Sequence, residues 1–95
     1  MEIIGTDLLD EFVARHTAAE KAIDTWCNLV RRANWNTPHD IKASFRSADF
    51  LHGNRVIFNI KGNHYRIVVQ VRYAEGKLSI EWIGTHAEYS RKKFH

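Results

Sequence analysis

Apolar residues in the first half of the chain recur at helical spacing. They return every three or four positions over residues 6–15 and again up to about Ala33, so each set falls on one face of a helix. Thr17–Glu20 matches a capping box, in which the hydroxyl and the carboxylate bond amides at the helix start. Thr37-Pro38 is a second start signal, because proline at the first helical position loses no hydrogen bond. We therefore expect two N-terminal helices and a short third helix to about Phe45.

From residue 55 the apolar period changes to two, which is typical of strands. Three strands are predicted, at residues 55–61, 64–73 and 78–84, with a candidate fourth at residues 2–4. Gly62-Asn63 predicts a tight hairpin and residues 74–77 a second turn. The order of elements predicts an α+β fold: two N-terminal helices packed on an antiparallel sheet of three to four strands, followed by a short C-terminal helix.

The two turns predict which residues lie side by side. A two-residue loop at Gly62-Asn63 pairs Asn59 with Arg66, and a four-residue loop at 74–77 pairs Arg66 with Thr85. This register places Trp82 in the core, under the helices. It leaves two rows on the opposite face: the polar row Asn59–Arg66–Thr85 and the apolar row Ile57–Val68–Ile83.

Composition narrows the class of protein. The chain has 95 residues, 44% hydrophobic and 26% charged, which predicts a single globular domain over residues 1–95. No apolar run approaches the roughly 20 residues of a membrane span, and the N-terminal segment is acidic rather than signal-like. The single cysteine, Cys27, excludes an internal disulfide, and the histidines show no compact metal-binding spacing. We expect a cytoplasmic protein with no metal, no cofactor and no membrane contact.

The net charge of +3 is unevenly distributed. Residues 1–51 hold six Lys/Arg and eight Asp/Glu, whereas residues 52–95 hold eight and three, with four of the six histidines. An anionic partner therefore belongs to the C-terminal half, and nucleic acid is the commonest such partner. A basic surface kept only for solubility is the alternative.

The polar face combines cations, a histidine and a phenol without a pair of carboxylates. The candidate catalytic residues are Arg66, His86, Lys61 and Tyr89, and the candidate substrate-binding residues are Asn59, His64, Thr85 and Arg55. These groups suit cleavage of RNA, because the substrate supplies its own nucleophile, the 2′-hydroxyl, and the protein need only move protons and stabilise charge. Arginine can hold a phosphate with two hydrogen bonds, and histidine titrates near neutral pH.

Two other classes of function fit the same residues. A non-catalytic RNA- or DNA-binding module would use the basic face for salt-dependent binding without cleavage. An interaction domain would instead use the apolar row Ile57–Val68–Ile83 as a docking surface.

Several motifs resemble one known family. VIFNIKGNHYRIVVQVRY (56–73) followed by IEWIGTHAEYSR (80–91), with TPHDIKASF upstream, resembles the HigB branch of the RelE-like bacterial toxins. The resemblance implies a RelE-like fold and a metal-independent mRNA endoribonuclease that acts in the ribosomal A site. It also implies a cognate helix-turn-helix antitoxin, through which alone the protein would contact operator DNA.

The resemblance also implies roles for individual residues. Arg66 takes the position of the arginine that contacts the scissile phosphate, and Lys61 that of an assisting basic residue. His86 stands where better-known relatives have a basic residue that stabilises the transition state. Tyr89 is the nearest match to a C-terminal tyrosine that contributes to activity. Asn59 stands where some relatives have a further basic residue, which leaves the general base unassigned.

Overall fold

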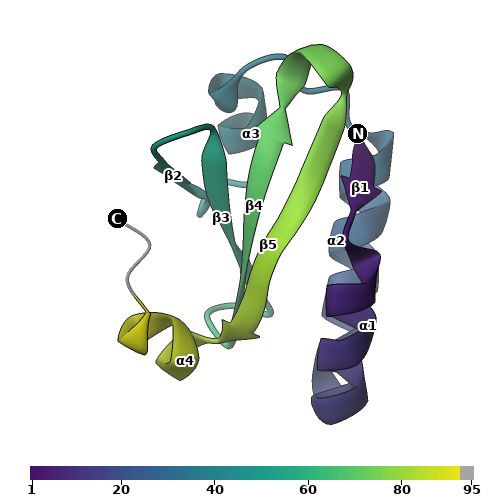
Figure 1. Cartoon of the computed structure of the whole chain (residues 1–95), viewed down its shortest axis with the longest axis vertical. Coiled ribbons are helices and arrows are strands. Elements are labelled where there is room, and N and C mark those ends of the chain that lie inside the picture. The colour runs from purple at the N-terminus through teal and green to yellow at the C-terminus, as the bar shows by residue number, and fades with distance from the viewer. Residues whose placement is uncertain (93–95) are drawn as a thin grey trace.

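The computed structural model describes residues 1–92, and Figure 1 shows the arrangement of its helices and strands. The elements in chain order are β1 (Glu2–Ile4), α1 (Thr6–Arg15), the 3-10 turn η1 (Thr17–Ala19), α2 (Glu20–Arg32), α3 (Pro38–Ser44), β2 (Asp49–Leu51), β3 (Arg55–Ile60), β4 (Tyr65–Arg72), the 3-10 turn η2 (Tyr73–Glu75), β5 (Lys77–Thr85) and α4 (His86–Arg91). The helices and strands predicted from the apolar pattern are present close to their predicted bounds. The pattern did not predict β2.

The sheet has five strands in the order β1–β5–β4–β3–β2, with β1 parallel to β5 and the other neighbours antiparallel. The prediction of an α+β fold is confirmed, whereas the prediction of an antiparallel sheet of three to four strands was wrong. Two short strands account for the difference. β1 joins β5 from the far end of the sequence, and such a pairing leaves no local signal. β2 has three residues, too few and too exposed to show an alternating pattern.

The helices pack on one face of the sheet and form the core there. Figure 1 shows α1 and α2 along one side of the sheet and α4 at the end of β5, away from them. Phe12, Trp26 and Phe58 are each no more than 2% exposed, and the Trp26 and Phe58 rings meet edge to face with centroids 5.3 Å apart. All three side chains belong to the core. We call the opposite face of the sheet the outer face.

The predicted helix start at Thr37-Pro38 is confirmed, and it includes a capping box. The Thr37 hydroxyl accepts the Asp40 backbone N–H at 3.3 Å, and the Asp40 carboxylate accepts the Thr37 N–H at 3.2 Å, with Pro38 in the first turn of α3. The predicted box at Thr17–Glu20 is absent: Thr17–Ala19 form η1, and α2 begins without a side-chain cap. The turn of 3-10 helix supplies its own hydrogen bond, so the threonine is not needed there.

The first hairpin has the predicted register. Asn59 lies opposite Arg66, and the Lys61 carbonyl accepts the His64 N–H at 3.2 Å, which closes the turn over Gly62-Asn63. Gly62 has a φ of 67°, a conformation that glycine adopts without steric cost.

The register predicted for the second hairpin was wrong. The predicted pairs were Arg66 with Thr85 and Val68 with Ile83, but Arg66 pairs with Gly84 and Val68 with Trp82. The connection lies one residue earlier than predicted, between Arg72 and Lys77, and a β-bulge between Val68 and Val69 shifts the pairing again. As a result Ile83 packs against the core, whereas Trp82 lies on the outer face. The apolar row on that face is therefore Ile57–Val68–Trp82.

Within residues 1–92, no helix has both the length and the apolar character to cross a membrane.

Candidate functional site

Arg66 of β4 lies on the outer face of the sheet, between β3 and β5. It pairs with Asn59 of β3 on one side and with Gly84 of β5 on the other, and its side chain is half-buried. Thr85 pairs instead with Tyr65. The polar row predicted as Asn59–Arg66–Thr85 is therefore Asn59–Arg66–Gly84, and only its first two members are those that the sequence indicated.

Two aromatic rings lie between two cations beside this row. The Arg66 guanidinium carbon lies 4.7 Å from the centroid of the Tyr89 ring, and the Tyr89 and Trp82 ring centroids are 6.0 Å apart. The Lys92 ammonium nitrogen lies 5.8 Å from the Trp82 ring. Cations are attracted to aromatic faces, so Arg66 and Lys92 are each held against a ring. We call these four residues the outer-face cluster.

Arg66 is held in place but keeps hydrogen-bonding capacity. Its Nε is buried and has no hydrogen-bond partner, and no carboxylate forms an ion pair with Arg66 among residues 1–92. By contrast, Arg55 on the same face is paired with Glu81 at 2.8 Å. An unpaired, half-buried guanidinium that is fixed by an aromatic ring can bind an anion such as phosphate.

Trp82 reaches the outer face because of the bulge in β5, and Gly84 makes room for its ring. A Cβ atom at position 84 would overlap the far edge of the Trp82 indole, so the indole lies across the glycine. The absence of a side chain at Gly84 also leaves space next to Arg66, its partner across the strands. The glycine is therefore required for the close approach of an aromatic ring.

A capping box fixes the start of α4, the helix that carries Tyr89. The Glu88 carboxylate accepts the Thr85 N–H at 2.7 Å, and the Thr85 hydroxyl accepts the Glu88 N–H at 3.1 Å. The hydrogen bond from the Thr85 backbone lowers the pKa of Glu88 below its ordinary value. The hydroxyl of Thr85, a predicted substrate ligand, is thus engaged in capping the helix.

The two histidines of the predicted site lie at the junction of the first hairpin and α4. The His86 backbone N–H donates to the His64 carbonyl at 3.0 Å, and both side chains are exposed. His86 is the first residue of α4, three positions before Tyr89.

Lys61 does not converge on Arg66. Its backbone has a φ of 53°, and its amine donates to the Ala18 carbonyl in η1 at 3.3 Å. The lysine therefore contacts the helical layer at the edge of the sheet.

Asn59 does adjoin Arg66, but its amide nitrogen donates to the Ser47 carbonyl at 3.0 Å. The amide oxygen of Asn59 is buried without a partner. This oxygen is the free hydrogen-bonding group that Asn59 presents beside the arginine.

Sequence reasoning missed Trp82 and Lys92 of the outer-face cluster. Trp82 was assigned to the core because strict alternation was assumed through β5. A small residue two positions after an aromatic one was the available signal, since Gly84 leaves space on the face that Trp82 occupies. Lys92 gave no pattern of its own. Among residues 1–92, no three His, Cys, Asp or Glu side chains are grouped so that they could hold a metal ion.

Comparison with known proteins identifies the family to which this chain is related. Residues 19–92 match the sequence model of a family described as "HigB_toxin, RelE-like toxic component of a toxin-antitoxin system". The chain is also similar to the mRNA interferase HigB of Escherichia coli O6:H1 (strain CFT073), with 20% identity over 93 residues that cover 96% of this chain and 90% of that protein. The range matched by the family includes all four residues of the outer-face cluster.

Proposed function

The chain belongs to the HigB toxin family, the RelE-like toxic components of toxin–antitoxin systems, and from this premise we propose that it is an mRNA endoribonuclease. The relative in E. coli is named an mRNA interferase, which supports the same activity here. The proposal includes a RelE-like fold, cleavage on the ribosome with mRNA bound in the A site, a cytoplasmic location and neutralisation by a helix-turn-helix antitoxin.

The observation that carries the proposal is the state of Arg66. The guanidinium is fixed on the Tyr89 ring at 4.7 Å, its Nε is buried without a partner, and no acidic side chain neutralises it within residues 1–92. A buried donor without a partner is costly, so such groups are commonly kept for a ligand. A phosphodiester supplies the missing acceptors and the missing charge together.

The reaction that suits this site is attack of the RNA 2′-hydroxyl on the adjacent phosphorus. The bond from phosphorus to the 5′-oxygen of the next nucleotide then breaks, which leaves a cyclic phosphate and a free 5′-hydroxyl. The protein has to remove one proton, return one proton and stabilise the charge on the phosphorane oxygens. Arg66 is assigned to stabilising the negative charge on the phosphorane oxygens, and the exposed His86 is assigned to one of the two proton transfers.

The remaining residues are assigned to binding the RNA. Tyr89 and Trp82 present aromatic rings next to the phosphate position, and single-stranded RNA is commonly bound by stacking of its bases on such rings. Lys92 extends the positive charge along the same face. Lys61 and His64, at the hairpin, and Asn59 and Arg55, on β3, are assigned to flanking contacts with the backbone.

The experiment that tests the proposal is mapping of mRNA 5′ ends after brief induction of the toxin, with and without an inhibitor of translation. Wild type should generate new 5′ ends only while translation continues. Arg66→Ala should reduce cleavage by about 10²–10³-fold, the usual effect of losing one donor to a developing charge. Arg72→Ala is the matched control, because Arg72 lies at the end of the same strand and is highly exposed.

Full cleavage by a well-folded Arg66→Ala variant would refute the site. RNA binding by wild type without new 5′ ends would favour the non-catalytic binding module instead.

The role of His86 is tested separately by the pH dependence of cleavage in a purified translation system. A histidine changes charge between about pH 5 and 8, so wild type should lose activity along one limb in this range. His86→Gln keeps a hydrogen-bonding side chain but cannot titrate, and its profile should lack that limb. An unchanged profile would show that His86 does not transfer a proton.

A further inference from the structure

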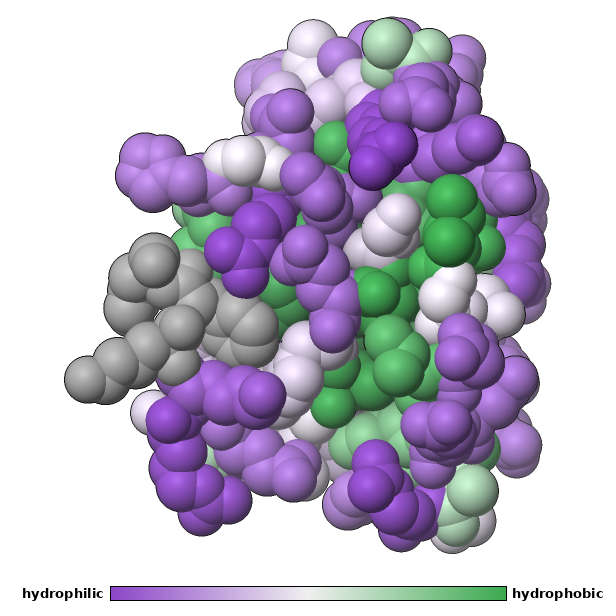
Figure 2. Space-filling view, viewed as in Figure 1, coloured by the Kyte–Doolittle hydropathy of each residue, from purple (hydrophilic) through white to green (hydrophobic). Residues whose placement is uncertain are grey.

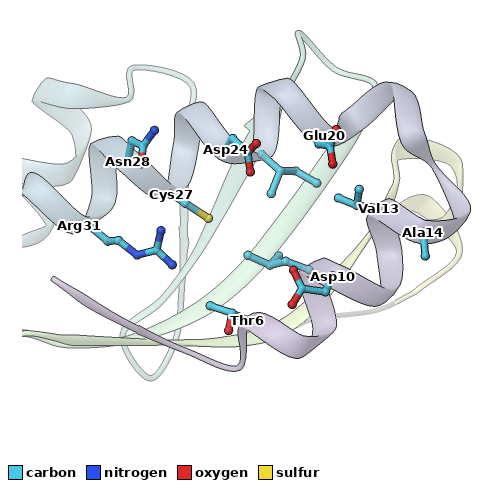
Figure 3. A pocket seen from close by; sticks show the side chains of 11 residues that line it. Thr6, Asp10, Val13, Ala14, Glu20, Asp24, Cys27, Asn28 and Arg31 are labelled. Carbon is cyan, nitrogen blue, oxygen red and sulfur yellow. The ribbon is translucent and has the colours of Figure 1, made fainter.

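A groove separates α1 from α2 on the helical side of the molecule. Figure 3 shows it from close by: the two helices diverge from η1, and side chains of both project into the space between them. Its volume is about 600 Å³, enough for several side chains of a partner. The groove is formed by the helical layer, whereas the outer-face cluster lies on the opposite face of the sheet.

The floor of the groove is apolar. Leu9 of α1 and Ile23 and Cys27 of α2 form it, with Val13 beside them, and the first three are buried. Figure 3 shows the Cys27 sulfur directed into the space between the helices. Burial raises the pKa of the Cys27 thiol, so the floor is uncharged at neutral pH.

The rim of the groove is acidic. Asp10, Glu20 and Asp24 line it and are exposed, and Arg31 is the cation at one end. None of the three carboxylates forms an ion pair with a cation among residues 1–92. Three unpaired carboxylates thus border an apolar floor in a protein whose net charge is +3.

This charge pattern selects the class of partner. Nucleic acid and anionic membrane surfaces attract cations and are repelled by clustered carboxylates. A peptide segment with apolar residues on one side and Lys or Arg on the other complements both the floor and the rim. Arg31, at the opposite end from Glu20 in Figure 3, gives the groove a polarity and suits an acidic residue at that end of the segment.

We propose that the α1–α2 groove is the docking site for a basic amphipathic segment of the antitoxin. The inference rests on the proposed function, because a toxin of this family has an antitoxin as its protein partner. The apolar side chains of the segment would cover Leu9, Ile23 and Cys27, and its cations would pair with Asp10, Glu20 and Asp24. The catalytic assignment of the outer-face cluster does not depend on this contact.

The test is the charge reversal of adjacent residues on α1. Asp10→Lys changes the rim, whereas Glu11→Lys makes the same change of charge one residue further on, at an exposed position that does not line the groove. Asp24→Lys is a second rim variant, on α2. Binding is measured by titrating each purified toxin with the antitoxin encoded by the neighbouring gene, at low and high salt.

We expect both rim variants to bind at least about tenfold more weakly than wild type at low salt, because like charges then face each other across the interface. Glu11→Lys should bind as wild type does. In cells the rim variants should stay toxic and no longer be neutralised by the antitoxin. Thermal unfolding checks that each variant is folded.

Wild-type affinity in both rim variants would overturn the inference. A rim variant that alters self-association of the free toxin, measured by sedimentation, while binding the antitoxin normally would also overturn it, since the groove would then hold a second copy. If wild type is not toxic, the proposed function is wrong, whereas the groove inference is still tested by antitoxin binding.

Discussion

The two faces of this sheet differ in what their residues do, although the residues alternate along the same strands. Ile67 is fully buried under the helices and belongs to the core, whereas its neighbour Arg66 is half-buried on the outer face and is stacked on Tyr89. The inner face carries core side chains of β3, β4 and β5, and the aromatic rings of Phe12 and Trp26 belong to the same core. The pleat of a strand thus separates the core from the proposed site at a spacing of one residue.

The outer face is not simply the solvated side of the sheet. Its apolar row ends in Trp82, and Val68 in the middle of that row is as buried as the core residues. Arg66 is two residues from Val68 along β4, and its guanidinium lies on the Tyr89 ring, which in turn is next to Trp82. Figure 2, in the view of Figure 1, shows hydrophobic residues exposed in the middle of the surface and hydrophilic residues around them. A buried row next to Arg66 gives the arginine rigid surroundings, and such support is what a site needs in order to be preorganised.

The largest expected effect comes from comparing substitutions of two adjacent residues that lie on opposite faces of the sheet. Ile67→Ala removes a fully buried side chain and should lower the free energy of unfolding by roughly 2–5 kcal/mol. Arg66→Ala should leave that free energy within about 1 kcal/mol of wild type, since no ion pair is lost, while cleavage falls. Urea denaturation and 5′-end mapping on the same two proteins measure both quantities. Comparable destabilisation by both substitutions would show that the outer face is structural as well.

A smaller effect is expected where the outer face is most tightly packed. Gly84→Ala places a methyl group against the Trp82 indole and should cost about 1–3 kcal/mol of stability, the usual range for overpacking. The displaced indole would also withdraw from Tyr89, so we expect cleavage to fall by about tenfold. Thermal unfolding and the cleavage assay measure the two effects.

A double mutant identifies the cause of that loss. In a Trp82→Leu background the added methyl has no indole to meet, so Gly84→Ala should cost little further stability. If the substitution is equally costly in both backgrounds, the contact between Gly84 and Trp82 is not responsible.

The smallest expected effect concerns the cap of α4. Thr85→Ala removes the hydroxyl that accepts the Glu88 N–H and should cost about 1 kcal/mol. The pKa of Glu88 is lower in the folded state than in the unfolded state, where it is about 4.3. The ionised carboxylate therefore stabilises the folded protein at pH values above the unfolded pKa, and this stabilisation is lost as the pH falls through the folded pKa. Thermal unfolding at pH 7 and pH 3 should therefore show a smaller difference between wild type and Glu88→Gln at pH 3. An equal difference at both pH values would contradict the capping role of Glu88.

The two hairpins show how far local signals extend. Gly62-Asn63 is a short turn, and a short turn permits only one register, so the pairing of Asn59 with Arg66 followed from the sequence. The second hairpin has a longer connection through η2 and a bulge after Ile80, and the register predicted from strict alternation was wrong. Bulges are set by packing on both faces of a sheet, and a single strand does not reveal them.

The candidate site likewise contains residues that the sequence placed correctly and one that it did not. Arg66 and Tyr89 were selected from the sequence, and the structure brings their side chains into contact at 4.7 Å. Lys61 was selected with them, but its amine bonds the Ala18 carbonyl in the helical layer. Its direction depends on a backbone with positive φ at the end of β3, which the alternation of residues does not encode.

The apolar period and the short-range signals were enough to predict the helices, the central strands, the first hairpin and the half of the chain that carries the positive charge. These features depend on residues within a few positions of one another. Tertiary structure alone decided the parallel pairing of β1 with β5, the bulge that turns Trp82 outward, and the groove between α1 and α2. Each of these arises where segments distant in sequence pack together, and the free energy of that packing depends on the assembled fold rather than on any one segment.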